Sequence, residues 1–224
     1  MLHALETLVD RVLDLLAPAR CSGCDEPCAS QKPFCESCAR QIQPVPVDRL
    51  DGVTLLSGAA YAPPVSTAIQ RLKYQARPDL AGRLAGFAVE QTSLFDVLGR
   101  VHGRALFVPV PLHPRRLAER GYNQSALVAR ALARRACGEY APRLLIRSID
   151  TAQQASLPRA RRATNVAGAF RVRAASSIRE RAIVLVDDVV TSGATARACL
   201  SALAGAGAEL LCAVSLARTL EPAA

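Results

Sequence analysis

The sequence predicts an α/β fold in which a mainly parallel sheet is flanked by helices, with a small cysteine-rich module near the N-terminus. Strand-like apolar runs alternate with helical segments through residues 52–220, which is typical of a parallel sheet. One of these runs, residues 183–186, holds four consecutive branched apolar residues, as expected for a strand buried on both faces. Five of the eight cysteines fall between positions 21 and 38, ahead of the alternating segments.

The length and composition of the chain are those of a globular protein. Its 224 residues allow one sizeable domain and a small appendage, and 50% of them are hydrophobic, which is enough for a buried core. No apolar run reaches the ~18 residues that a membrane span needs. Acidic and basic side chains interrupt residues 1–16, which therefore do not resemble a secretory signal. We expect a cytoplasmic protein.

The first element expected along the chain is an amphipathic helix, which we assign to residues 1–17. Leucine and valine recur at helical spacing through residues 2–16. Such a helix packs on its own domain or, as the less favoured alternative, lies on a membrane surface.

The cysteine-rich module contains two Cys-x-x-Cys pairs separated by ten residues, and we assign it to residues 18–42. The four cysteines of these pairs are Cys21, Cys24, Cys35 and Cys38. Paired knuckles of this kind can present four thiolates in a tetrahedron, which predicts a zinc ribbon with four cysteine ligands. Four sulfur ligands leave no open coordination position, so the zinc would be structural. Unligated or redox-active thiols are the alternative, and Cys28 is a spare or an alternative ligand.

The remaining elements follow from local apolar patterns. Residues 43–48 contain two prolines and indicate a linker. The apolar segments that predict strands are residues 53–61, 105–110, 144–149, 169–172, 183–186 and 210–216. The segments that predict helices run from the Pro63-Pro64 pair to Tyr74 and over residues 78–97, 125–136 and 194–204. Residues 151–166 form a polar stretch too long for a plain connection.

The strand at residues 183–186 leads into the most informative motif of the chain. Two acidic residues, Asp187 and Asp188, follow the strand, and a loop of small residues then leads into a helix. The residues of this loop are Thr191, Ser192, Gly193, Ala194 and Thr195. A helix N-terminus offers free N–H groups to a phosphate, whereas carboxylates can hold sugar hydroxyls or a hydrated Mg²⁺. A site with carboxylates at one end and a phosphate-binding loop at the other fits a ribose 5-phosphate.

Arginines near a second strand end extend this predicted site. Arg115, Arg116 and Arg120 follow the strand at residues 105–110, and guanidinium groups bind phosphate oxygens bidentately. These arginines are suited to binding a pyrophosphate. The alternative is that they belong to a solvated basic loop that binds no ligand. Arg159 and Arg162, in the long polar stretch, could close over a pyrophosphate as part of a lid and stabilise the charge of the leaving group. A plain surface loop is the alternative there.

The net charge of +9 also favours an anionic partner, either nucleic acid or a pyrophosphate. Nine residues are aromatic and none is tryptophan, which gives little support to a nucleic-acid stacking platform. Lys73 ends a predicted helix, where a cation suits the helix dipole.

Residues 183–195 resemble the motif by which type I phosphoribosyltransferases bind 5-phosphoribosyl 1-pyrophosphate (PRPP), and the chain as a whole resembles the ComF family. The segments that carry the family resemblance are the four cysteines, Tyr61-Ala62-Pro63-Pro64, Leu72-Lys73-Tyr74, Val108-Pro109-Val110-Pro111, Arg120-Gly121-Tyr122-Asn123-Gln124-Ser125, Gln154…Leu157…Arg162…Asn165, and the Asp187-Asp188 unit.

This resemblance implies a phosphoribosyltransferase-like domain at residues 52–220 behind a zinc ribbon, and a link to DNA uptake in natural competence. It implies that Asp187 and Asp188 meet the ribose hydroxyls and that residues 191–195 bind the 5′-phosphate. Lys73 joins the expected substrate-binding residues.

Two functional hypotheses follow. In the first, an enzyme binds Mg²⁺-PRPP, pyrophosphate leaves, and a nitrogenous acceptor attacks the anomeric carbon; Asp187, Asp188, Arg159 and Arg162 carry the catalysis. In the second, a non-catalytic nucleotide sensor or DNA-binding accessory keeps the phosphate site and has single-stranded DNA or competence proteins as partners. The sequence identifies no acceptor pocket and no oligomeric state.

Overall fold

The computed structural model of the chain describes residues 19–28, 32–99, 104–148, 168–173 and 178–220. The predicted N-terminal helix and the loop that carries Arg159 and Arg162 lie outside the described residues, so both stay predictions. Within the described ranges, no helix has the length and apolar character needed to cross a membrane.

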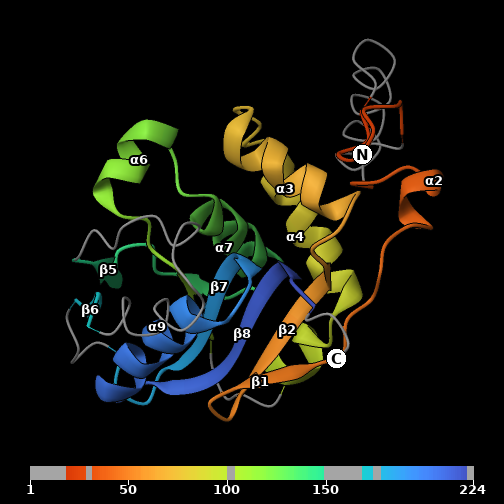
Figure 1. Cartoon of the computed structure of the whole chain (residues 1–224). Coiled ribbons are helices and arrows are strands. Elements are labelled where there is room, and N and C mark those ends of the chain that lie inside the picture. Colours follow the sequence, from red (N-terminus) through yellow and green to blue (C-terminus); the bar gives the residue numbers. More distant parts are fainter. Residues whose placement is uncertain (1–18, 29–31, 100–103, 149–167, 174–177, 221–224) are drawn as a thin grey trace, which may run out of the picture.

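A six-stranded sheet with the order β1-β2-β8-β7-β3-β4 forms the centre of the described part of the molecule (Figure 1). Its strands are β1 (Asp48–Leu50), β2 (Val53–Ala60), β3 (Leu106–Pro109), β4 (Glu139–Tyr140), β7 (Ala182–Val190) and β8 (Glu209–Arg218). Neighbouring strands are parallel except for β1, which pairs antiparallel with β2. A separate antiparallel pair joins β5 (Leu145–Arg147) to β6 (Phe170–Val172). The predicted mainly parallel α/β fold is confirmed.

Helices cover both faces of this sheet. The helices are α2 (Glu36–Ala39), α3 (Val65–Tyr74), α4 (Leu80–Gln91), α5 (Leu94–Leu98), α6 (Pro114–Arg120), α7 (Gln124–Arg135) and α9 (Ala194–Gly205). Helices α3, α4 and α7 pack on one face together with Val184 and Val186 of β7. Helix α9 packs on the other face with Ile183 and Leu185. Because strand residues alternate between faces, the apolar run of β7 serves both cores.

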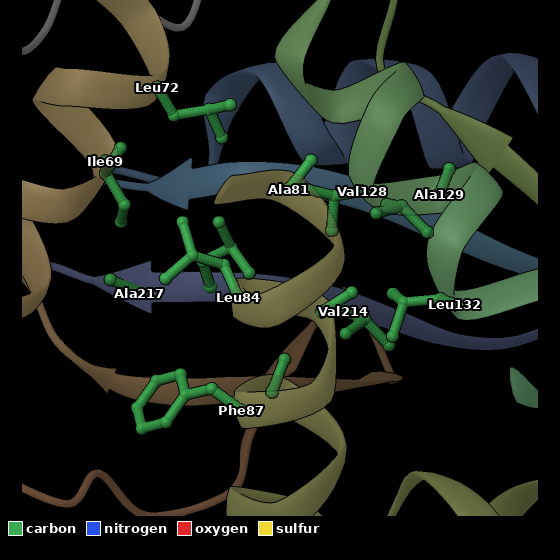
Figure 2. Close-up of a cluster of buried hydrophobic side chains, with 14 of the residues drawn as sticks. Ile69, Leu72, Ala81, Leu84, Phe87, Val128, Ala129, Leu132, Val214 and Ala217 are labelled. Atoms are coloured by element: carbon green, nitrogen blue, oxygen red, sulfur yellow. The ribbon is translucent and has the colours of Figure 1, made fainter. Parts of the chain in front are cut away.

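The core under α3, α4 and α7 is built from aliphatic side chains (Figure 2). Leu72 of α3, Leu84 of α4 and Leu132 of α7 have no exposed surface. Burying a leucine of this kind contributes about 1.5–3 kcal/mol relative to leaving it exposed. Figure 2 shows these helices converging over β8, where Val214 and Ala217 lie below them.

Three local departures from the sequence expectations have physical causes. The helix expected at residues 78–97 divides into α4 and α5, because Thr92 is extended and its hydroxyl donates to the Ala88 carbonyl at 2.7 Å. The proline- and arginine-rich loop contains α6, which begins with Pro114 at its first turn. The predicted linker ends in β1, four residues before the expected start of the main domain at residue 52.

Strand β7 is longer than its apolar run suggests. It continues to Val190 because β8 pairs with it as far as Arg218. Its other neighbour, β3, pairs only up to Val186. The acidic pair that the sequence suggested would follow the strand therefore lies inside it, beyond the end of β3.

Candidate functional site

The acidic pair lies where the sheet changes its direction of winding. Strands β3 and β7 are neighbours, yet α7, which connects onward to β4, covers one face and α9, which connects β7 to β8, covers the other. Ligands of open α/β sheets bind at such a switch point, outside the carboxyl ends of the strands. The last contact between the two strands is the hydrogen bond from Val110 N–H to the Val186 carbonyl. Asp187 and Asp188 follow at once.

Asp188 forms an ion pair with Lys73 from the end of α3. The Nζ atom lies 2.8 Å from Oδ2, and the two side chains are 16% and 6% exposed. The other carboxylate oxygen accepts a hydrogen bond from the Val189 N–H at 2.7 Å. Burial alone would lower the pKa of Lys73, but Asp188 and Asp187 outweigh it and raise this pKa. Lys73 thus lies in the predicted site, and its partner is a carboxylate of that site.

Asp187 is held by the start of α7. Its Oδ1 accepts hydrogen bonds from the Ser125 hydroxyl at 3.0 Å and from the Asp188 N–H at 2.9 Å. Burial and the neighbouring charge of Asp188 raise the pKa of Asp187 to about 7, against the lowering effects of Lys73 and the hydrogen bonds.

The segment between α6 and α7 organises this corner of the site. Gly121 adopts a φ of +81°, which ends α6. The Asn123 side chain accepts from the N–H groups of Ser125 and Ala126 and donates to the Val110 carbonyl at 3.0 Å, so it fastens α7 to the end of β3. The Tyr122 hydroxyl donates to the carbonyl of Leu72 in α3.

Sequence reasoning did not assign a role to Ser125 or Asn123. Asparagine directly before a helical pattern is a recognisable N-cap signal, which could have identified Asn123. No local signal links Ser125 to Asp187, because the two residues are far apart in the chain and meet only through the fold.

The structure separates the three predicted arginines of the β3 end. The Arg120 guanidinium lies over the ring of Tyr74, 5.0 Å from its centroid, and donates to Gln124 Oε1 at 2.6 Å. Arg115 and Arg116 are exposed on α6, and Arg115 pairs with Glu119 at 3.2 Å. Arg120 is thus joined to the end of α3 that also carries Lys73.

The loop from Thr191 to Thr195 ends at the start of α9. Gly193 precedes the helix with a φ of +74°, and a Cβ there would lie 2.8 Å from both Leu50 Cδ2 and Arg197 Nη1. The left-handed φ favours glycine at this position, and a larger residue would also displace the ends of these two side chains. Among the described residues, no side chain caps the N-terminus of α9, which leaves its first N–H groups available. Thr191 is exposed, and Ser192, Ala194 and Thr195 are half-buried.

The four cysteines of the two Cys-x-x-Cys pairs come together in space. The Sγ atoms of Cys21, Cys24, Cys35 and Cys38 all lie within 4.8 Å of one another. Four thiolates around one zinc ion lie roughly 3.8 Å apart. The Cys24 and Cys35 sulfurs are already 3.6 Å apart, and the Cys35 N–H donates to Cys21 Sγ at 3.3 Å. The cluster could hold a metal ion.

Cys28 lies outside this cluster and has other partners. Its sulfur accepts from Arg83 Nη2 at 3.3 Å and lies 3.6 Å from the Lys32 carbonyl oxygen. Cys28 is therefore not one of the four clustered cysteines, which come together without it.

The cysteine module packs directly on α3 and α4. Phe34 meets Phe87 edge to face with ring centroids 5.4 Å apart. Arg71 of α3 donates to the Cys21 carbonyl at 3.3 Å, and Arg83 of α4 donates to the Arg20 carbonyl at 2.8 Å. The module and the main domain therefore share one hydrophobic core.

Comparison with known proteins identifies a related domain and several related chains. The family model of the phosphoribosyl transferase domain matches residues 123–222, which include the start of α7, β7, the 191–195 loop and α9. DNA utilization protein YhgH of Escherichia coli O157:H7 is 33% identical, covering 89% of this chain and 90% of that protein. The Salmonella typhimurium protein of the same name is 30% identical, covering 89% and 84%. Competence protein F of Haemophilus influenzae is 28% identical, covering 88% and 90%.

Proposed function

This chain belongs to the ComF family and carries a phosphoribosyltransferase-like domain, and from that premise we propose that it binds PRPP or a related ribose 5-phosphate ligand. The ligand would lie at the carboxyl end of β7. One observation carries the proposal: a carboxylate pair at the switch point of the sheet is followed, after the end of β7 and a short loop, by a helix N-terminus that no described side chain caps.

The chemistry of the two ends of the site fits the two ends of the ligand. Asp187 and Asp188 can accept hydrogen bonds from the ribose hydroxyls. The N–H groups at the start of α9 and the hydroxyls of Thr191, Ser192 and Thr195 can donate to the 5′-phosphate. Gly193 lets the backbone approach the phosphate without a side chain in between.

The pyrophosphate of PRPP needs positive charge. A Mg²⁺ ion bound to the pyrophosphate would supply part of it, because phosphate oxygens and waters are the ligands that Mg²⁺ prefers. Arg115 and Arg116 on α6 and the predicted lid residues Arg159 and Arg162 would supply the rest. Asp187, Asp188, Arg159 and Arg162 are the residues we assign to a transferase reaction.

We assign a structural zinc ion to the cysteine cluster. Four thiolates suit zinc and leave it no open position for catalysis. Such a site persists most readily in a reducing compartment, which supports a cytoplasmic location.

The relatives carry names that refer to DNA utilization and to competence. We propose that this chain serves the same process, with its net positive charge favouring single-stranded DNA or nucleotide partners. Proteins of the competence machinery are the other proposed partners.

Calorimetric titration with Mg²⁺-PRPP tests the site. Replacing Asp187 and Asp188 with Asn should abolish binding, because an amide accepts fewer hydrogen bonds and carries no charge toward the hydroxyls. Asp96→Asn, a change of an exposed carboxylate on α5, is the matched control and should bind as the unchanged protein does. Circular dichroism must show that the double variant is folded. Unchanged affinity in that folded variant would refute the assignment.

A screen for PRPP-dependent pyrophosphate release, run across nitrogenous bases and amines, decides between the two functional hypotheses. Release that depends on one acceptor would show a transferase and would name its substrate. Binding without release under all acceptors would favour a nucleotide sensor or DNA-binding accessory.

A further inference from the structure

Arg197 is a charged side chain that folds back from α9 onto the loop in front of that helix. Its Nη1 atom donates to the Ser192 carbonyl at 2.8 Å, and its Nε atom donates to Asp51 Oδ1 at 3.1 Å. Its backbone N–H donates to the Gly193 carbonyl at 2.8 Å. One residue therefore holds two successive carbonyl groups of the loop.

Holding a carbonyl group also fixes the N–H group of the same peptide. The peptide bond is planar and trans, so its C=O and N–H point in opposite directions. Because Arg197 holds the carbonyls of Ser192 and Gly193, the N–H groups of Gly193 and Ala194 are turned to the other side. Among the described residues, neither of these two N–H groups has a hydrogen-bond acceptor. The loop thus has its carbonyl oxygens occupied on one side and its donors available on the other.

The orientation of these peptides decides whether the loop attracts or repels an anion. Successive N–H groups form an anion-binding nest, whereas a reversed peptide would present a partly negative carbonyl oxygen to a phosphate. Glycine populates positive and negative φ about equally, so Gly193 alone does not fix the orientation of the peptide before it. The hydrogen bond from the Arg197 side chain to the Ser192 carbonyl supplies that constraint.

Asp51 holds the Arg197 guanidinium from the connection between β1 and β2. The two side chains are 41% and 69% exposed, so water screens much of their attraction. The geometric effect of the pair remains, because it restricts a long side chain that would otherwise have many rotamers. Leu50 of the same connection lies against Gly193, where an added Cβ would be 2.8 Å from Leu50 Cδ2. The connection therefore supports the loop on the side where Arg197 lies.

We propose that Arg197 is a positioning residue for the 5′-phosphate. It holds the peptide between Ser192 and Gly193 with the N–H toward the ligand, and Asp51 holds Arg197 in place. The role requires no contact between the guanidinium and the phosphate. This inference rests on the proposed function and adds the pair of residues that orders the loop before the ligand binds, which lowers the cost of binding.

Calorimetric titration of the full chain with ribose 5-phosphate tests this role. Arg197→Met removes the donors and keeps an aliphatic side chain. It should weaken binding about tenfold, because a hydrogen bond from a charged donor is lost and the peptide is free to reverse. The same ratio should be found at low and high salt, since salt screens charges and leaves peptide orientation unaffected. A loss that disappears at high salt would show that Arg197 acts only through its charge, and would overturn the proposal.

Asp51→Asn has an effect whose sign separates positioning from charge. Removing a carboxylate near an anion site should strengthen binding if charge alone matters. If Asp51 positions Arg197, the substitution should instead weaken binding, by about twofold to fivefold. Asparagine tolerates the φ of +50° at residue 51, so the turn is kept. Unchanged or tighter binding by this variant would refute the role given to Asp51.

Glu139→Gln is the matched control. It breaks another partly exposed ion pair, in which Glu139 lies 3.0 Å from Arg181 at the start of β7, and it should leave the affinity unchanged. Circular dichroism establishes that each variant is folded. If the unchanged protein binds ribose 5-phosphate and folded Arg197→Met binds it equally well, the positioning role fails while the phosphate site stands. If the unchanged protein does not bind ribose 5-phosphate, the proposed function fails, and the positioning role fails with it.

Discussion

At the scale of single residues, the ion pair between Lys73 and Asp188 balances part of the negative charge of the candidate site. Two adjacent carboxylates in a largely buried place would repel each other, and the ammonium group offsets much of that repulsion. Asp187 has no such direct cation among the described residues, which is why its pKa rises to about 7 through burial and the charge of Asp188. The site thus combines a carboxylate in direct contact with an ammonium group and a second carboxylate whose pKa is raised by burial and by its neighbour.

Removing the ammonium group of Lys73 should therefore lower the free energy of unfolding strongly. Lys73→Met leaves Asp188 buried without its partner, and breaking a buried pair in this way costs about 3–5 kcal/mol. Adding Asp188→Asn should recover most of that loss. Urea denaturation of the single and double variants gives the free energies of unfolding.

Arg77 and Asp79 provide the control for that experiment. They are also 2.8 Å apart, but their side chains are 39% and 57% exposed. Arg77→Met should cost less than about 1 kcal/mol, because water screens the pair. Equal losses for Lys73→Met and Arg77→Met would contradict the role given to burial.

The predictability of the site also differs from residue to residue. Asp187, Asp188 and Gly193 were predictable because strand, acidic pair and loop are consecutive in the sequence. The pairing of Lys73 with Asp188 was not, since on position alone the lysine only suits a helix dipole. The pairing depends on how α3 packs on the sheet, where it contacts β8 next to β7, and no local pattern encodes that packing.

At the scale of elements, the unit from β7 through the loop into α9 depends on one backbone conformation. Gly193 has a φ of +74° directly before the helix. Arg197 contacts this turn by donating to the Ser192 carbonyl at 2.8 Å and pairs with Asp51 at 3.1 Å. The loop is thereby tied to the β1–β2 connection as well as to its own helix.

Gly193→Ala should destabilise the protein by about 1–3 kcal/mol, because the left-handed φ is strained for alanine and the ends of the Leu50 and Arg197 side chains must move to admit the new Cβ. Gly82→Ala on α4 is the opposite case, with an ordinary helical backbone and no atom of the described residues within 4 Å of the added Cβ. It should stabilise the protein by about 0.5–1 kcal/mol. Thermal unfolding of both variants should show a lower stability for Gly193→Ala and a higher stability for Gly82→Ala. An equal loss of stability in the two variants would contradict this reasoning.

Long elements followed the sequence more faithfully than short ones. The strands β2 and β8 and the helix α7 lie within a few residues of their predicted ranges, since each has a sustained apolar period. The split between α4 and α5 depends on one hydroxyl of Thr92 that competes with the helix backbone. The two-residue β4 exists because it pairs with β3 and has little pattern of its own.

At the scale of the whole molecule, the cysteine module is part of the main fold. Cys21, Cys38 and Phe34 belong to the same hydrophobic core as α3 and α4. Spacing of the cysteines predicted a metal site, but not that the module would be anchored by Phe87, Arg71 and Arg83. These contacts join segments far apart in the chain, so no local pattern indicates them.

Metal removal should consequently destabilise the entire chain. Elemental analysis should find about one zinc ion per chain, and Cys21→Ser/Cys24→Ser should lose it. We expect the unfolding temperature to fall by roughly 6–12 °C, corresponding to about 3 kcal/mol in a chain of this size. Cys137→Ser, at an exposed cysteine outside the cluster, should retain both metal and stability.

Differential scanning calorimetry distinguishes a shared core from an independent module. The metal-loaded protein should unfold in one transition. Two separate transitions, of which a chelator shifts only the smaller, would contradict a shared core.

The four residues that end α3 each contact a different part of the molecule. Arg71 binds the cysteine module, Leu72 is buried in the core, Lys73 pairs with Asp188 of β7, and Tyr74 stacks with Arg120. Successive helical residues are about 100° apart, so these four directions require one rotational setting of the helix. Deleting or inserting a single residue between Pro64 and Arg71 would turn all four side chains away from their partners together. The length of α3 is therefore more tightly constrained than the identity of its solvent-facing residues.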